Sequence, residues 1–262
     1  KGEKQMGKRL IIIGAAIFAA LFLFSSIMLF SEYQDQKQSA RVFKQVTELV
    51  EKDFTESEQK KSPFEKYAAV YEKNHDLIGW ITIEGTRIDY PVMQTKEKPN
   101  FYLKHAFDKS YSRYGVPYIA ENCDIDVSDN IVIYGHHMNN GSMFSDLCRY
   151  ADEDFYKAHR TIRFDTLGSF GEYEIISVFK TTVYSEQGFS YYHFVNAGSE
   201  STFNEYVSKC TELSLYNTGA TAKYGDKLIT LSTCEYSRTN GRMVVVAKKI
   251  CSDSKGRKQN ET

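Results

Sequence analysis

The chain has 262 residues, of which 42% are hydrophobic and 14% aromatic, so it can fill one sizeable core and is not a largely disordered protein. Its formal net charge of −1 hides an uneven distribution, because residues 1–30 carry a net charge of +3 and the remainder carries −4. That balance gives no indication of nucleic-acid binding.

The first predicted element is a transmembrane helix at 10–30, a stretch of 21 residues without a charge. At about 1.5 Å per residue it would reach roughly 30 Å, the thickness of the hydrocarbon core of a bilayer. Residues 1–9 form a basic segment, and Glu32 and Asp35 follow the apolar stretch. The positive-inside bias therefore predicts a single-pass anchor in the cell membrane, with a cytoplasmic N-terminus and an extracellular remainder.

A cleaved signal peptide is the alternative interpretation of this segment. Its apolar stretch is longer than the usual ~7 to 15 residues, and no small-x-small cleavage site follows directly. An uncleaved anchor therefore remains the preferred prediction.

Residues 31–74 are predicted to form an extracellular helical stalk and N-terminal helices. Sparse apolar residues at helical spacing continue the anchor helix. Further on, 62–65 reads Ser-Pro-Phe-Glu, the pattern of a capping box with proline at the first helical position. A second short helix is therefore expected to begin there.

Residues 75–251 are predicted to form a single domain, a mainly β barrel of about eight strands. Short β-rich runs separated by turn residues indicate the strands. Helical periodicity at 142–150 and at about 199–213 predicts two helices packed on the outside of the barrel. The polar tail, 252–262, is predicted to be disordered.

A β-hairpin near the C-terminus places a cysteine and an arginine at its mouth. Because side chains alternate along a strand, Ile229 and Leu231 share a core face. Thr230, Ser232 and Cys234 share the other, smaller and more polar face, which is suited to the floor of a groove. Seven residues ending in Asn-Gly separate Cys234 from Arg242. The antiparallel return is therefore expected to bring Arg242 within side-chain reach of Cys234.

A third polar group follows another apolar strand, where Gly135 precedes His136 and His137. A histidine pair can bind a metal ion, but no acidic or cysteine ligand with convincing spacing accompanies this one, so no metal site is predicted. The cysteine, the arginine and the histidine are thus candidates for one polar site at neighbouring strand ends.

These motifs resemble the sortases, the membrane-anchored cysteine transpeptidases of Gram-positive bacteria. The similarity rests on "TLSTC", on an arginine just before "MVVVA", and on "IYGHH" upstream, and it extends through "IGWITIEGTRIDYPVMQ" and "KYGDKLITLSTCEYS". It covers about residues 75–250 and is closest to class B, which has N-terminal helices before the barrel and a helix in the long connection preceding the cysteine strand. The resemblance thus implies an eight-stranded sortase-type β-barrel.

The resemblance also implies roles for individual residues. Cys234 would be the nucleophile, His136 the general acid and base, and Arg242 the group that binds the oxyanion and orients the substrate, with no cofactor. His137 would be a supporting residue. Positions matching the class B substrate groove are Leu103, Tyr134, Ser232 and Glu235. The segment 181–194 is expected to form a wall of that groove.

A sortase would cleave surface proteins after the threonine of a C-terminal sorting motif, through a thioester, and transfer them to an amine of the cell-wall precursor. Transfer to a pilin lysine is an alternative acceptor chemistry. A secreted cysteine protease would more usually pair its cysteine with Asn or Asp and place it at the start of a helix. An L,D-transpeptidase would require a His-Gly-Cys arrangement, which is missing around Cys234. A non-catalytic wall-binding module would predict an unreactive Cys234.

Overall fold

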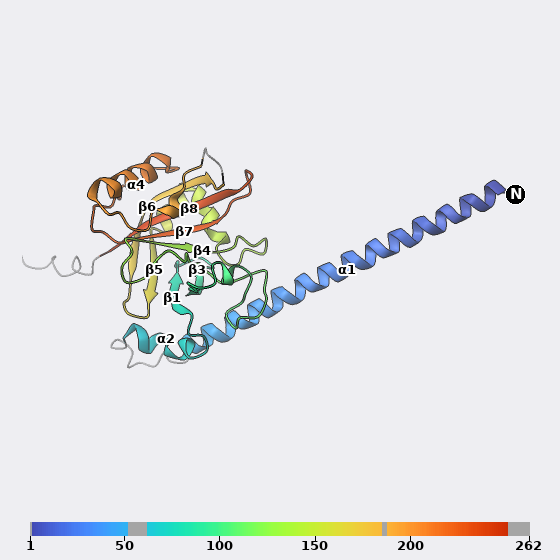
Figure 1. The fold of residues 1–262 in the computed structure, drawn as a ribbon, viewed down its shortest axis with the longest axis horizontal. Helices are drawn as coiled ribbons and strands as arrows, with labels where there is room; N and C mark the ends of the chain where they lie inside the picture. The colour runs from blue at the N-terminus through green and yellow to red at the C-terminus, as the bar shows by residue number, and fades with distance from the viewer. Residues whose placement is uncertain (1, 52–61, 185–187, 251–262) are drawn as a thin grey trace, which may run out of the picture. The chain divides into compact units, whose positions relative to one another are not determined.

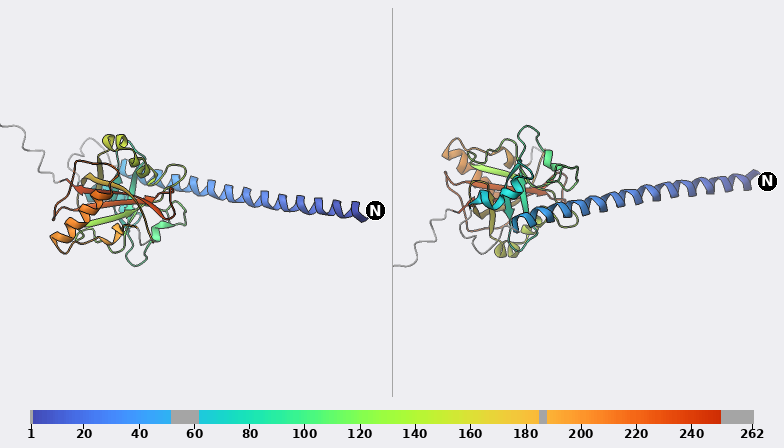
Figure 2. Two further views of the ribbon diagram at one scale, coloured as in Figure 1. Left: turned by 90° about the horizontal axis from the view of Figure 1, so that it is seen from above. Right: turned by 90° about the horizontal axis from the view of Figure 1, so that it is seen from below.

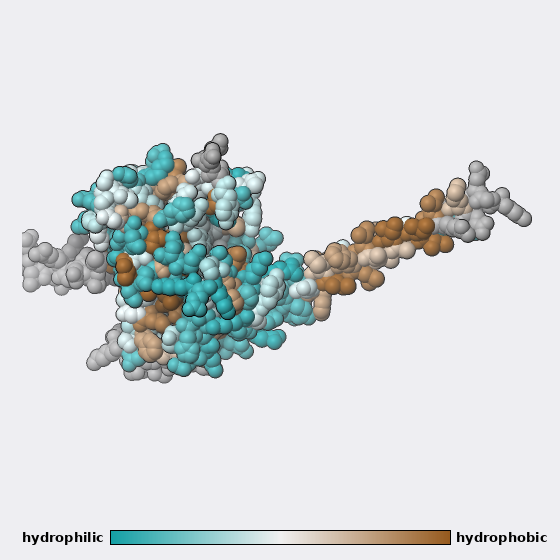
Figure 3. Space-filling model, viewed as in Figure 1, coloured by the Kyte–Doolittle hydropathy of each residue, from teal (hydrophilic) through white to brown (hydrophobic). Residues whose placement is uncertain are grey.

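The computed structural model describes residues 2–51, 62–184 and 188–250, and the chain divides into two compact units, 1–41 and 42–262. Helix α1, Gly2–Glu51, forms the first unit and continues into the second. Its apolar side chains are exposed along the helix, as Figure 3 shows in brown. Within the described part of the chain it is the one helix long and apolar enough to cross a membrane, which is compatible with a single-pass anchor.

The second unit contains a closed barrel of eight strands in the order β1-β2-β3-β4-β7-β8-β6-β5 (Figure 1). The strands are β1 (Leu77–Thr82), β2 (Asp89–Met93), β3 (Tyr118–Ile119), β4 (Asn130–Tyr134), β5 (Thr161–Thr166), β6 (Glu172–Thr182), β7 (Leu228–Cys234) and β8 (Gly241–Lys249). Strand β7 lies parallel to β4 and antiparallel to β8. The predicted eight-stranded fold is therefore confirmed.

The predicted outer helices are present, with one difference in type. Helix α4, Glu200–Leu213, lies in the connection between β6 and β7, on the outside of the barrel (Figure 2). The segment expected to be helical at 142–150 forms a 3-10 helix, η3 (Ser145–Ala151), followed by the short helix α3 (Glu153–Ala158). Asp152, between them, is in an extended conformation and caps α3 with its side chain, which ends the first helix there.

The polar face of β7 is covered over more of its length than the sequence predicts. Thr230 is fully buried. Its hydroxyl donates to the side-chain oxygen of Asn130 at 2.8 Å and lies 3.2 Å from the hydroxyl of Tyr206 on α4. Ser232 is also buried, whereas Cys234 is half-buried at the strand end. Only the last part of this face, from Ser232 onward, is therefore available to line a groove.

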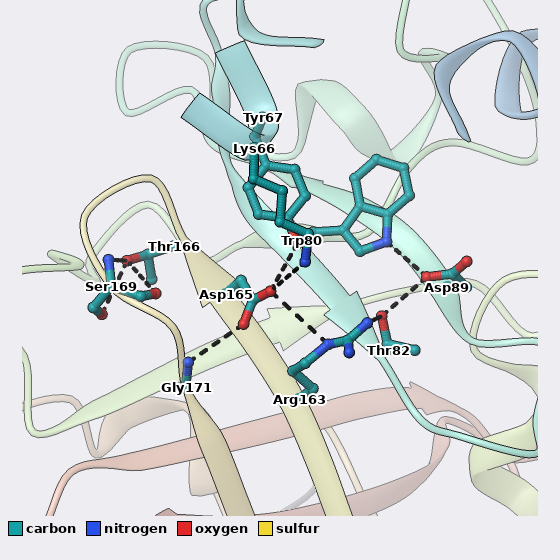
Figure 4. Close-up of polar contacts among 10 residues, drawn as sticks. All are labelled: Lys66, Tyr67, Trp80, Thr82, Asp89, Arg163, Asp165, Thr166, Ser169 and Gly171. Atoms are coloured by element: carbon teal, nitrogen blue, oxygen red, sulfur yellow. Dashed lines mark hydrogen bonds and ion pairs between the residues drawn. The ribbon is translucent and has the colours of Figure 1, made fainter. Parts of the chain in front are cut away.

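Helix α2, Pro63–Tyr71, begins at the predicted capping box and is joined to the barrel by a buried polar network (Figure 4). Asp165 of β5 is 1% exposed and accepts hydrogen bonds from the Tyr67 hydroxyl at 2.7 Å and the Lys66 ammonium at 3.0 Å. The Tyr67 ring stacks on Trp80 of β1, whose indole nitrogen donates to Asp89 at 2.7 Å. Since a buried carboxylate is costly without partners, these bonds fix the position of α2 on the barrel.

Candidate active site

The β7–β8 hairpin sets a thiol opposite a guanidinium. Cys234 is the last residue of β7 and is the direct register partner of Arg242 on β8, as the hairpin prediction required. The turn closes when the Glu235 amide donates to the Gly241 carbonyl at 2.9 Å. Arg242 also donates from Nη1 to that carbonyl at 2.9 Å, which holds its guanidinium beside the strand end.

The β4 strand brings His136 to the same end of the barrel. Because β4 and β7 are parallel and Tyr134 is the partner of Ser232, the residues after both strands emerge together. Gly135 has no room for a side chain here, since a Cβ would lie 2.5 Å from the Phe144 ring. Nε2 of His136 lies 2.7 Å from the carbonyl oxygen of Leu103. A carbonyl only accepts, so Nε2 carries the hydrogen of this bond.

Six of the seven site residues predicted from the sequence line one cavity of about 320 Å³. They are Cys234, His136, Arg242, Leu103, Tyr134 and Ser232. Within the described residues, no group of histidine, cysteine and acidic side chains forms a candidate metal site. The cavity therefore combines a thiol, an imidazole and a fixed positive charge, the groups needed for acyl transfer through a thioester.

Glu235, the seventh predicted residue, is not among the cavity-lining residues. Its carboxylate accepts hydrogen bonds from the Lys180 ammonium at 3.2 Å and the Ser237 hydroxyl at 2.6 Å. Burial by itself would raise the pKa of Glu235, but the bonds from Ser237 and Lys180 outweigh it and lower that pKa. Glu235 is thus an ionised group that stabilises the β7–β8 turn.

Several further residues line the cavity without having been predicted as site residues. Tyr191 is buried, and its hydroxyl lies 2.6 Å from that of Ser232. Tyr118 donates to the side chain of Asn100 at 2.8 Å, and both line the cavity. Glu121 adds a carboxylate that makes no ion pair or hydrogen bond with the part of the chain that the structure describes.

The sequence held only a partial signal for these residues. In the segment 181–194, which was expected to form a groove wall, Val183, Tyr184, Tyr191 and Tyr192 line the cavity, and 185–187 fall outside the described residues. No motif marks Tyr118 or Glu121. Their proximity to Cys234 follows from the pairing of β3 with β4, a contact that a local pattern does not reveal.

Comparisons with known proteins agree with this geometry. The sequence matches the sortase domain over residues 81–250. Sortase B of Listeria monocytogenes is 30% identical over 254 residues, covering 95% of this chain and 99% of that protein. A Staphylococcus aureus sortase B–substrate complex superposes with a TM-score of 0.75 at 26% identity, covering 84% of this chain and 99% of that one. A sortase B complexed with triglycine gives a TM-score of 0.74 at 27% identity, covering 83% and 99%.

These matches and the closed barrel identify the chain as a cell-wall cysteine transpeptidase. The chain belongs to the sortase family, and its relatives place it in class B, as the sequence motifs implied.

Proposed function

We propose that this sortase cleaves surface proteins after the threonine of a C-terminal sorting motif and transfers them to an amine of the cell-wall precursor. The observation that carries the proposal is the lining of one cavity by Cys234, His136 and Arg242, with Cys234 and Arg242 in direct register. Each group has a role in the two steps of the reaction.

In the first step, the Cys234 thiolate attacks the threonine carbonyl carbon and forms a carbon–sulfur bond. The carbonyl electron pair moves onto oxygen, where Arg242 donates hydrogen bonds to the developing oxyanion. As the intermediate collapses, the carbon–nitrogen bond breaks and His136, as an imidazolium, gives its proton to the departing amine. The acyl group then remains on the sulfur as a thioester.

In the second step, the acceptor amine attacks the thioester carbon. His136 takes the proton released from the nitrogen, the carbon–sulfur bond breaks, and the thiolate returns. The related sortase B complexed with triglycine supports a peptide amine as acceptor, because a glycine tripeptide offers an N-terminal amine and no lysine side chain. This favours the wall precursor over a pilin lysine.

The sorting peptide would lie along the cavity between the wall formed by Leu103 and the floor formed by Tyr134 and Ser232. Two aromatic rings, Tyr191 and Tyr192, would cover it from the β6–β7 connection. Glu235 would reach the peptide only by releasing its present hydrogen-bond partners. Its proposed contribution is therefore to hold the turn that follows Cys234.

The chain organisation proposed from the sequence fits this activity. Residues 10–30 would anchor the enzyme in the membrane, with 1–9 in the cytoplasm, and 31–74 would carry the catalytic barrel at 75–251 outside the cell. An extracellular barrel tethered to the membrane would meet both secreted proteins and lipid-linked wall precursors. The excess of positive charge before the span supports this orientation.

The test uses the full chain in detergent with a library of threonine-containing pentapeptides, in the presence of triglycine or of a peptide whose only amine is a lysine side chain. The expected result is a thioester on Cys234 detected by mass spectrometry and a product joined to triglycine. Cys234→Ala should give neither. Cleavage that Cys234→Ala retains would refute the proposed nucleophile, and cleavage with no transfer to either amine would indicate a protease.

A further inference from the structure

His136 and Cys234, two residues of the proposed site, lie beyond the end of the β4–β7 pairing that brings them together. The β4–β7 register ends at Tyr134 and Ser232, and one more backbone bond joins the Gly135 amide to the Ser232 carbonyl at 3.1 Å. His136 and Cys234 each follow that register by two residues. Their separation is therefore not set by the ladder itself.

Side chains continue the connection where the ladder stops. Nδ1 of His137 lies 3.0 Å from the carbonyl oxygen of Cys234. In the opposite direction, the Tyr236 hydroxyl donates to the carbonyl of His137 at 3.2 Å. The residue after His136 and the residue two after Cys234 thus form a reciprocal pair of bonds across the two strand ends.

Cys148, from η3, supports the first of these bonds. Its Sγ lies 3.2 Å from Nδ1 of His137 and 3.6 Å from the Cys234 carbonyl oxygen. Burial raises the pKa of the Cys148 thiol to about 11, so at neutral pH it remains a thiol and a hydrogen-bond donor. Neither Cys148 nor His137 is among the cavity-lining residues, so they do not form a second nucleophile and base for the peptide.

The geometry also fixes which ring nitrogen of His137 carries hydrogen. A carbonyl oxygen only accepts, so at 3.0 Å Nδ1 must donate to it. The carbonyl has two lone pairs, and the Cys148 thiol can donate to the second. The Cys234 carbonyl is therefore held by two donors from different segments.

We infer that His137 is a positioning residue for Cys234, with Cys148 as its support. By holding the Cys234 carbonyl, His137 fixes the peptide plane that follows the cysteine Cα, and so the direction in which Sγ enters the cavity. The same side chain is joined through one peptide bond to His136. It therefore sets the nucleophile and the proposed acid–base group relative to each other, an arrangement in which small displacements are costly to rate.

This inference rests on the proposed function, because it concerns the presentation of the proposed nucleophile. Two substitutions separate a positioning role from simple packing. The amide nitrogen of His137→Asn is attached at the same branch point as Nδ1 and can replace that donor. The amide nitrogen of His137→Gln lies one bond further out, near the place of Nε2, and cannot do so without a shift.

The experiment measures kcat and KM for peptide transfer to triglycine by the full chain in detergent, together with the thermal midpoint of each variant. We expect His137→Ala to lower kcat about 10-fold with KM within about twofold of wild type, as a misplaced nucleophile would. His137→Asn should recover kcat to within about threefold of wild type, whereas His137→Gln should resemble His137→Ala.

His159→Ala is a matched control, because Nδ1 of His159 makes the same kind of bond, at 2.8 Å to the Glu84 carbonyl, away from the cavity. It should leave kcat unchanged. Wild-type kcat in His137→Ala, or equal losses in the Asn and Ala variants, would overturn the inference. An active Cys234→Ala enzyme would instead refute the proposed function, so the two failures can be told apart.

Discussion

The substitution Arg242→Lys separates the charge of this residue from its shape. In the structure one N–H of the guanidinium donates to the Gly241 carbonyl at 2.9 Å. The others make no hydrogen bond with the described residues, and Arg242 is one of the residues that line the cavity. A planar guanidinium can therefore stay bound to its own strand while donating two further bonds to a substrate.

Lysine would keep the positive charge and lose that arrangement. Its ammonium group concentrates its donors on a single nitrogen at the end of a flexible chain, so it cannot bind the strand carbonyl and two substrate oxygens in one plane. Hydrogen bonds to charged groups contribute about 1.5 to 3 kcal/mol each. Loss of two weaker ones, about 3 kcal/mol in the transition state, corresponds to a decrease of about 10² in kcat/KM.

The assay is steady-state transfer of a sorting peptide to triglycine by wild type, Arg242→Lys and Arg242→Ala, alongside the pH dependence of Cys234 alkylation. Arg238→Lys is the control, because Arg238 is exposed in the same turn and does not line the cavity. We expect Arg242→Lys to lose transfer while its alkylation profile stays close to wild type. Transfer by Arg242→Lys within about threefold of wild type would refute the geometric role and leave charge alone as the contribution.

Four further outcomes are expected. His136→Ala should lower transfer by at least about 10², as for loss of a general acid and base, in the same peptide assay. Tyr67→Phe should destabilise the barrel by about 2 kcal/mol, because Asp165 loses a buried donor; urea unfolding followed by the single tryptophan measures this. The pKa of Glu235 is lowered on folding, so its carboxylate stabilises the protein at pH values above the unfolded-state pKa. The difference in unfolding free energy between wild type and Glu235→Gln should therefore shrink as the pH of the urea titration falls through the folded-state pKa. The Glu121 carboxylate at the cavity should give the wild type a roughly three- to fivefold higher kcat/KM for peptides carrying lysine than for those carrying glutamate, and Glu121→Lys should reverse this preference.

Much of the site was predictable because its central groups belong to two local patterns. Strand alternation and a short hairpin loop are enough to bring Arg242 opposite Cys234, and the register shows this pairing. The position after an apolar strand and a glycine indicated the pair His136 and His137, and the resemblance to the sortases selected His136. The sequence could not show that β4 and β7 are adjacent, because that pairing joins segments almost a hundred residues apart.

The remaining cavity walls depend on tertiary contacts that leave no local trace. Alternation predicted a polar groove floor along β7, yet Thr230 is covered by Tyr206 of α4, so burial by a distant helix overrides the strand pattern. Glu235 follows the proposed nucleophile in sequence but turns toward Lys180. Whether a residue next to a sequence motif faces the cavity therefore depends on its hydrogen-bond partners elsewhere in the chain, which the motif does not reveal.

The contact between His136 and Leu103 has a consequence for how the reaction proton must move. Nε2 is occupied by the Leu103 carbonyl at 2.7 Å, so the neutral imidazole keeps its hydrogen on Nε2 and its lone pair on Nδ1. In the proposed mechanism, the imidazolium that protonates the leaving amine would then give up the Nδ1 proton, and the incoming amine would deliver its proton to the same nitrogen. Since Leu103 also lines the cavity, a peptide that displaces its turn would release Nε2 and disturb this assignment. In this mechanism Leu103 would act on catalysis through its backbone carbonyl, so a change of its side chain that preserves the turn should alter peptide binding more than the proton transfer itself.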